Sequence, residues 1–194
     1  MSVAGVPKPG RRAALRALAM LAVLTLPFQA RAGVGIPAEV AAELPNAKLI
    51  GSGRLSFMLM HVYDARLWGR DGFNAADHAK TPLALELEYA RPLVGAMIAE
   101  RSVEEMKRHG DFSGETAQRW LAALKLIFID VNKGDRITAV QVPGIAARLF
   151  LNGKFSGEVR DAEFTRLFFG IWLSPRTSQP KLREALLGPA RAAS

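Results

Sequence analysis

Residues 82–90 (PLALELEYA) carry the pattern that most restricts the fold of this chain. Large apolar side chains occupy every second position and alternate with smaller or charged ones: Leu83, Leu85, Leu87 and Tyr89 against Ala84, Glu86 and Glu88. Because the side chains of a strand point alternately to its two faces, this period predicts a strand with one buried and one wet face. A sheet built from such strands needs a second layer to cover its buried face.

Helical segments are available to form that layer. Apolar residues recur at three- and four-residue steps over 114–128, behind the candidate N-cap Ser113, and over 162–173, behind the candidate cap Asp161. Other patterns predict a loop over 69–80, a helix over 93–109, strands over 136–142 and 146–151, a hairpin at Asn152–Gly153 returning through 154–159, and a short helix near 181–187. Residues 47–68 have strand character with a reversal near Met58–Met60, and 33–46 predict an irregular or briefly helical lead-in. The order of elements predicts an α+β fold, with helices gathered against a mainly antiparallel sheet.

The N-terminus predicts export. Residues 1–32 hold five of the 26 Lys and Arg and none of the 18 Asp and Glu, so the remainder, with 21 against 18, has a net charge of +3 rather than +8. This ordinary charge gives no support to nucleic-acid binding. A basic start, an apolar core over 17–28 and small residues before Gly33 are typical of a secretory signal peptide cleaved near Ala32–Gly33. We therefore expect a periplasmic protein that does not span the membrane and that has one domain over 33–194. The alternative is that the N-terminal segment is not cleaved and anchors the protein at the membrane interface.

Most motifs that could carry chemistry have a simpler interpretation. His61, His78 and His109 lack further ligands at metal-binding spacing, so we expect no metal site and no cofactor. The glutamates at 100, 104 and 105 share a predicted helix with basic residues, which favours a solvated, salt-bridged face over an acid–base cluster. Aromatic residues at helical spacing form either plain core or the wall of a ligand pocket: Trp120, Trp172, Phe164, Phe168 and Phe169.

Arg54 is harder to explain, because it heads an otherwise apolar run (GSGRLSFMLMHVY). A guanidinium in such a place requires an anion, and its fork matches a carboxylate. If the chain reverses through a two-residue loop near Met58–Met60, then Arg54, Ser56, His61 and Tyr63 share one face, and Arg54 can cooperate with Tyr63. The alternative is a structural salt bridge from Arg54 to an acidic residue.

A series of short motifs resembles the bacterial chalcone-isomerase-like proteins over about 46–188: LIGSGRLSF, HVYDARLW, LELEYAR, MIAERSVEEM, GDRITAVQVPG, FLNGKFSGEV and EFTRLFFGIWLSPRTSQPKLREALLG. The resemblance implies an open-faced β-sandwich, in which a large antiparallel sheet is covered by a layer of helices with a ligand cleft between them. It also implies that Arg54 is the family's signature arginine. That arginine assists ring closure in the plant isomerases and holds the carboxylate in the fatty-acid binders.

Two departures from the plant isomerases favour binding over catalysis. Tyr63 stands where the isomerases have threonine and the fatty-acid binders have tyrosine. The positions near Met97–Ile98 and Gly170 lack the polar groups with which the isomerases contact their substrate. The resemblance thus implies a ligand site of Arg54, Ser56, Tyr63, Met97, Ile98 and Phe168 for a fatty acid or similar amphiphilic acid. Two alternatives stay open: an isomerase (intramolecular lyase) with Arg54 as its only candidate catalytic residue, and an accessory protein that binds an unknown protein partner and has a vestigial cleft.

Overall fold

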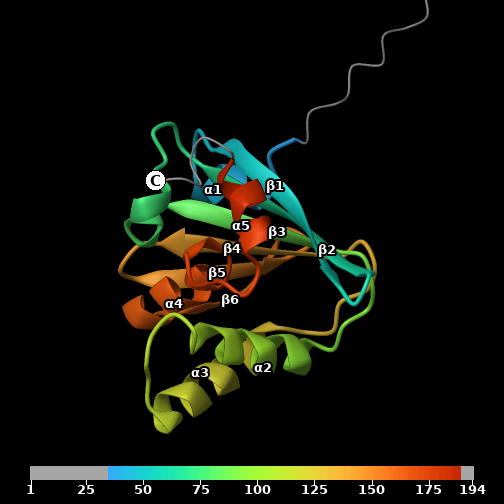
Figure 1. Cartoon of the computed structure of the whole chain (residues 1–194), viewed down its shortest axis with the longest axis vertical. Helices are drawn as coiled ribbons and strands as arrows, with labels where there is room; N and C mark the ends of the chain where they lie inside the picture. The colour runs from blue at the N-terminus through green and yellow to red at the C-terminus, as the bar shows by residue number, and fades with distance from the viewer. Residues whose placement is uncertain (1–34, 189–194) are drawn as a thin grey trace, which may run out of the picture. The chain divides into compact units, whose positions relative to one another are not determined.

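The computed structural model describes residues 35–188, which build a six-stranded antiparallel sheet (Figure 1). Each strand pairs with the next along the chain, in the order β1 (Lys48–Phe57), β2 (Met60–Gly69), β3 (Leu83–Tyr89), β4 (Arg136–Val142), β5 (Ala146–Leu151) and β6 (Lys154–Val159). Two-residue turns close the β1–β2 and β5–β6 hairpins, the second at the predicted Asn152–Gly153. The α+β architecture and the antiparallel sheet with its helical cover are confirmed.

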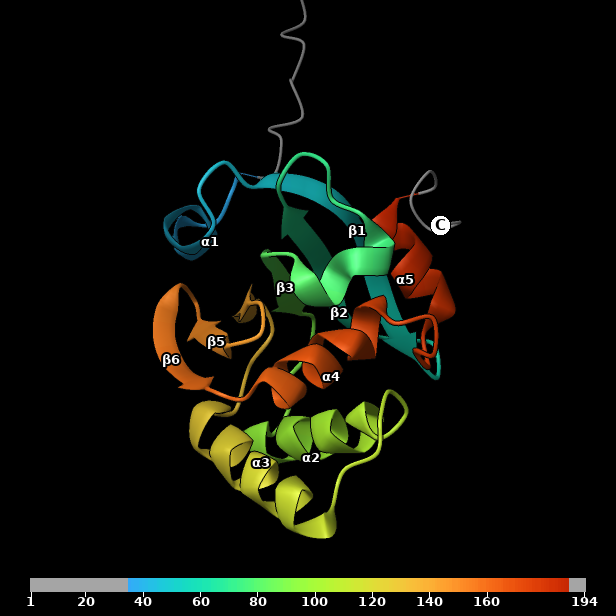
Figure 2. The same cartoon turned by 90° about the vertical axis from the view of Figure 1, so that its left-hand side faces the viewer.

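Helices cover the two faces of the sheet unequally (Figure 2). The larger layer contains α2 (Gly95–Met106), α3 (Gly114–Ile127), α4 (Ala162–Leu173) and α5 (Pro180–Leu187). Within this layer α3, α4 and α5 contact the strands directly, while α2 packs against α3 and α4. A single short helix, α1 (Ala38–Glu43), packs on the opposite face.

We call the face under the larger layer the inner face. The odd-numbered residues of β3, from Leu83 to Tyr89, belong to its core, as the alternation predicts. The expectation that the other face of this strand is wet is wrong, because α1 covers it and Ala84 and Glu86 are buried there. Phe164, Phe169 and Trp120 are buried in the same core, which supports the core interpretation for these three aromatic residues.

The opposite, outer face has its own small core and a set of ion pairs. Val40 and Leu44 of α1 pack there against Trp68 and Ala84. Four arginines, which we call the outer arginines, each meet at least one carboxylate on this face: Arg54 with Asp64, Arg66 with Glu86 and Glu88, Arg136 with Glu39, and Arg148 with Glu43. The Glu39 and Glu86 carboxylates are buried, so these pairs hold α1 and the central strands together.

Most predicted elements are found close to their expected bounds. Ser113 and Asp161 cap α3 and α4 by accepting backbone N–H groups, as predicted. The loop predicted over 69–80 contains a short 3-10 helix, η1 (Ala75–Lys80), and α2 ends at Met106, three residues before the predicted end. The predicted signal peptide lies outside the described residues, among which no helix is long and apolar enough to cross a membrane.

Candidate functional site

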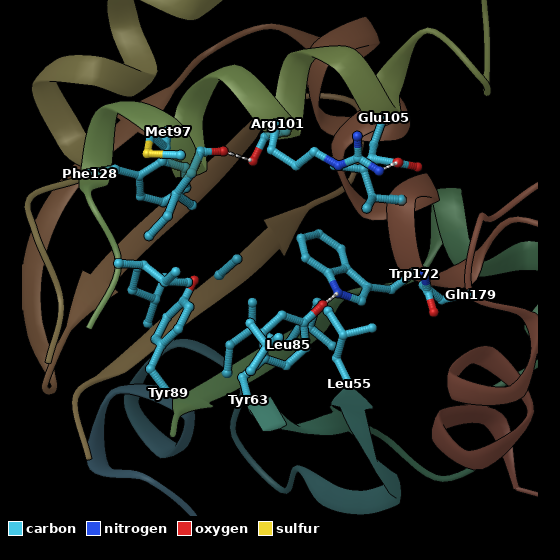
Figure 3. A pocket seen from close by; sticks show the side chains of 18 of the residues that line it. Leu55, Tyr63, Leu85, Tyr89, Met97, Arg101, Glu105, Phe128, Trp172 and Gln179 are labelled. Atoms are coloured by element: carbon cyan, nitrogen blue, oxygen red, sulfur yellow. Dashed lines mark hydrogen bonds and ion pairs between the residues drawn. The ribbon is translucent and has the colours of Figure 1, made fainter. Parts of the chain in front are cut away.

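A cavity of about 520 Å³ lies between the inner face and the helices α2 and α4 (Figure 3). Its volume falls within the range of about 300–1,000 Å³ that is usual for small-molecule sites. Most of its wall is apolar, formed by the sheet residues Leu55, Leu85, Leu87, Ile137 and Ala139 and by Ile98, Phe128, Phe168 and Ile171 above them. The cavity is therefore suited to a hydrophobic ligand.

Two phenol rings stand on the sheet side of the cavity. Tyr63 and Tyr89 meet edge to face, with ring centroids 5.9 Å apart, and both side chains point into the space (Figure 3). Trp172 Nε1 donates a hydrogen bond of 2.9 Å to the Tyr63 hydroxyl oxygen, so the Tyr63 O–H remains available as a donor. No described residue hydrogen-bonds the Tyr89 hydroxyl. The site thus offers two neutral donors that the protein leaves unused.

Burial keeps both phenols protonated. It raises the pKa of Tyr63 to about 12, although the hydrogen bond from Trp172 opposes this, and the Glu105 carboxylate adds to the rise. Burial also raises the pKa of Tyr89, with a smaller contribution from Tyr63. At neutral pH the two side chains are uncharged donors and cannot act as phenolate bases.

The helical side of the cavity carries an ion pair. Arg101 donates to the buried carboxylate of Glu105 one turn further along α2, and Arg108 Nε lies 3.2 Å from the other oxygen of Glu105. The expectation of a solvated face is met by Glu100 and Glu104, which pair with Lys125 and Arg101 at the surface. It is wrong for Glu105, which the packing of α2 turns toward the cavity.

The rim of the cavity includes exposed apolar residues and one further arginine. Phe57, at the end of β1, and Met97, in the first turn of α2, are both exposed and both line the opening. Arg91, between β3 and α2, also lines the cavity and directs Nη1 to the sulfur of Met60 at 3.1 Å. No carboxylate of the described residues pairs with Arg91. Arg91 is thus a guanidinium at the cavity without an anionic partner.

Arg54 lies elsewhere, and the expectation that it shares a face with Tyr63 is wrong. The turn has two residues, Met58 and Leu59, which is the loop length that the shared face required, but Val62 forms a bulge between the Ser56–His61 and Leu55–Tyr63 pairs. This extra residue brings Tyr63 opposite Leu55 on the inner face and leaves Arg54 opposite Asp64 on the outer one. Arg54 donates to Asp64 through Nε at 2.8 Å and Nη2 at 3.3 Å, which is the salt-bridge alternative. Ser56 is exposed and does not line the cavity either.

Two glycines explain why Arg54 lies on the outer face. A Cβ on Gly51 would collide with the backbone of α5 at Ala185, and a Cβ on Gly53 would lie 2.8 Å from a methyl group of Leu182. Both glycines therefore have to face α5, on the inner side. Arg54 directly follows Gly53, so it must point to the outer face.

The other four expected site residues, Tyr63, Met97, Ile98 and Phe168, all line the cavity. The sequence interpretation missed Tyr89, Arg91 and Glu105, together with the leucines of β3. The alternation over 82–90 contained the signal for the β3 residues, since it placed Leu85, Leu87 and Tyr89 on the buried face. For Arg91 no local pattern was available, because its position depends on how the chain leaves β3.

The cavity has no set of side chains that would hold a metal ion. Within 35–188, no three His, Cys, Asp or Glu residues gather as metal ligands would. The chemistry that the arrangement can perform is the burial of an apolar chain, hydrogen bonding from the phenols and the attraction of an anion to the rim.

Comparisons with known proteins agree with this architecture. The family model described as chalcone isomerase-like matches residues 28–188. An uncharacterised protein of Haemophilus influenzae is 28% identical over 152 residues, which cover 78% of this chain and 73% of that protein. Among solved structures, the crystal structure of an Arabidopsis thaliana fatty-acid binding protein superposes with a TM-score of 0.58 at 15% identity, covering 77% of this chain and 90% of the plant protein. At this identity the structural match concerns the fold.

Proposed function

Because this chain belongs to the chalcone isomerase-like family, we propose that it is a binding protein that holds a fatty acid or a similar amphiphilic carboxylate between its sheet and its helices. The cavity carries this proposal, since it combines apolar walls with an unpaired arginine at the rim. The fold match to a plant fatty-acid binding protein supports the same class of ligand. A vestigial cleft, as in the accessory-protein alternative, would be filled by side chains rather than open.

The acyl chain would occupy the interior. Each methylene group that leaves water contributes about 0.8 kcal/mol, so the tail would supply most of the affinity. The phenol hydroxyls of Tyr63 and Tyr89 could donate hydrogen bonds to a neutral oxygen on the chain or to bound water. An ionised carboxylate is less suited to the interior, because it would lie near Glu105 without a free cation beside it.

The head group would therefore stay at the rim, on Arg91. A guanidinium binds a carboxylate through two parallel hydrogen bonds, and Arg91 has no competing acid among the described residues. Arg54 is not part of the proposed site, because it is paired with Asp64 on the outer face of the sheet. The same placement removes the oxyanion-stabilising group from the isomerase alternative.

Two arginine variants provide a matched test. We expect Arg91→Ala to weaken fatty-acid binding about tenfold to a hundredfold, since a charge-assisted contact contributes about 1.5–3 kcal/mol. Arg54→Ala removes an arginine that faces away from the cavity, and it should leave the dissociation constant unchanged within about twofold. Isothermal titration calorimetry measures both, and native mass spectrometry of the purified protein detects ligand that copurifies. An equal loss in both variants, or no fatty-acid binding at all, would reject the proposal.

We also propose that the chain is exported to the periplasm and cleaved near Ala32–Gly33. The basic, then apolar, character of residues 1–32 supports this. Mass spectrometry of the protein from a periplasmic extract should give a mature N-terminus at Gly33. A full-length chain retained in the cytoplasm would contradict export.

A further inference from the structure

The tip of the β1–β2 hairpin, Phe57–Met60, exposes four consecutive apolar side chains. Their exposed fractions are 63% for Phe57, 77% for Met58, 102% for Leu59 and 46% for Met60. Other exposed apolar residues in the described part of the chain lie singly or with one exposed neighbour, and a scatter of this kind is normal on protein surfaces. Four in a row at a protruding turn is unusual and indicates a surface that meets an apolar phase.

The backbone of the turn makes this choice of residues more unusual. Both turn residues have positive φ angles, 47° for Met58 and 65° for Leu59. In two-residue turns of this kind, asparagine and glycine are the residues that fit the backbone best. The chain instead places two bulky apolar side chains there, against the conformational preference. The backbone of the turn therefore does not account for these side chains, and their exposure points to a contact outside the protein.

The tip is continuous with the cavity. Phe57 belongs to both, and Met97 stands on the rim nearby, so an apolar path leads from the exposed turn into the interior. Arg91 contacts Met60 and lies beside the same path. A lipid that leaves a bilayer at the tip would pass its tail over the apolar side chains of Phe57 and Met97, and its anionic group would meet Arg91.

We propose that the Phe57–Met60 tip inserts into a lipid bilayer with anionic headgroups and that the ligand passes between the bilayer and the cavity along Phe57. Three features favour lipid over a protein partner. The tip is convex and carries no charged or hydrogen-bonding side chain, its two-residue turn leaves little backbone unpaired, and the adjacent Arg91 suits an anionic headgroup. The transfer step rests on the function proposed above, whereas insertion of the tip does not.

The absence of cysteine from the chain permits a direct test of insertion. Leu59→Cys places a single reactive thiol at the tip, and Leu126→Cys places one at an exposed apolar position on α3, where Leu126 is 85% exposed. Each full-length variant is labelled with an environment-sensitive fluorophore and mixed with vesicles of phosphatidylglycerol and phosphatidylethanolamine that contain a quencher on the acyl chains. We expect a blue shift and quenching for the label at position 59 and neither at 126. This comparison is internal, so any contribution of the N-terminal segment to vesicle binding affects both variants alike.

The response of the two labels distinguishes insertion into lipid from binding to a protein and from no binding. A label at 59 that stays unquenched with vesicles, or that responds no more than the label at 126, overturns the proposal. Protection of the label at 59 only when another protein is added would identify a protein partner and would also overturn it. Vesicles of phosphatidylcholine alone should give weaker quenching, because they remove the anionic headgroups.

A double variant tests the transfer step without endangering the fold. Met58→Asn with Leu59→Gly installs the residues that the turn prefers, so the protein should be at least as stable as the wild type. Loading of a fluorescent fatty acid from vesicles should slow about tenfold or more, because the inserting apolar surface is gone, while the affinity for dissolved fatty acid stays within about twofold. Unchanged loading would refute transfer through the tip. Failure of every variant, the wild type included, to bind dissolved fatty acid would refute the proposed function, and the label at position 59 would still test insertion.

Discussion

The two faces of the sheet differ in whether their polar groups have partners within the protein. On the outer face, each of the outer arginines has a carboxylate, and Trp68 donates its indole N–H to Glu86 at 2.8 Å. On the inner face, the hydroxyl of Tyr89 and the proton of Tyr63 have no partner among the described residues, and at the cavity rim the hydrogen bond of Arg91 goes to the sulfur of Met60. The outer face pairs its arginines with carboxylates, although Nε of Arg136 and Nε of Arg148 make no hydrogen bond, whereas the inner face leaves hydrogen-bonding capacity beside open space.

This difference separates structural from binding residues better than residue type does. Arginine, glutamate and an aromatic ring occur on both faces, but they stabilise the fold on one and border a cavity on the other. If this distinction holds, substitutions on the outer face should change mainly stability, and matched substitutions on the inner face should change mainly ligand binding.

The largest effect is expected at Glu86. Glu86→Ala removes a buried carboxylate that accepts from Arg66 and from Trp68, so it leaves the Trp68 indole N–H without an acceptor and the part-buried Arg66 with Glu88 as its remaining carboxylate. Loss of one member of such a buried pair costs about 3–5 kcal/mol of unfolding free energy. Tyr89→Phe, which removes an unpartnered hydroxyl from the inner face, should change it by less than about 0.5 kcal/mol. Urea denaturation of both variants measures the difference, and equal losses would contradict the distinction between the faces.

The next largest effect is expected when alanine is replaced by phenylalanine on each face of the sheet. Ala84, on the outer face, is fully buried against α1 and Trp68, so Ala84→Phe should overpack that core and destabilise the protein by about 1–3 kcal/mol. Ala139 borders the cavity, so the new ring in Ala139→Phe has room to enter it. We expect Ala139→Phe to keep most of the stability but to weaken fatty-acid binding at least about tenfold. Thermal unfolding and calorimetry of the two variants check this, and a destabilised Ala139→Phe with normal binding would show that the cavity is not where the ligand lies.

The ionisation of tyrosine at alkaline pH should report on the inner face, because Tyr63 and Tyr89 are the only tyrosines in the chain. The pKa of Tyr63 rises from 10.0 to about 12 in the folded protein, so between these values the unfolded chain loses its proton first and folding stability falls as pH rises. The loss for Tyr63 should reach about 1 kcal/mol near pH 11, and Tyr63→Phe should remove that part of the dependence. The tyrosinate absorbance of the native protein should stay low up to that pH. Ordinary ionisation near pH 10 would show that the phenols are open to solvent.

The smallest effect is expected at the exposed edge of the outer face. The hydrogen bond and charge of Arg54 hold the pKa of Asp64 below its usual value, so the stabilisation is present above the unfolded-state pKa and is lost as pH falls through the folded one. Because 61% of the Arg54 side chain is exposed, water screens the pair, and Arg54→Ala should leave the unfolding midpoint at neutral pH almost unchanged. A large destabilisation would mean that Arg54 has a structural role beyond this pair.

The sequence predicted the elements well because their signals are local. The alternation over 82–90, the caps Ser113 and Asp161 and the Asn152–Gly153 turn each act within a few residues, so one chain is enough to find them. The reversal near Met58–Met60 was also predicted correctly, but the pattern left the length of its loop open, and both turn residues, Met58 and Leu59, are unusual for a two-residue turn.

The composition of the site was harder to predict because it depends on contacts between distant segments. Val62 forms the bulge without any glycine to mark it, and the bulge reverses the face on which Tyr63 lies relative to Arg54. The glycines at 51 and 53 held the missing information, but only the position of α5, more than a hundred residues later, shows which side they must face. Arg91 likewise acquires its role from the neighbouring hairpin, where it meets Met60.

The three tryptophans of this chain give each region its own spectroscopic reporter. Trp68 lies on the outer face beside Glu86, Trp120 is packed among the helices with Phe164, and Trp172 reaches the cavity and bonds to Tyr63. A chain that retains Trp172 alone would therefore emit from the cavity wall. Its fluorescence would follow the filling and emptying of that space in real time, and a chain that retains Trp68 alone would remain silent to the same event.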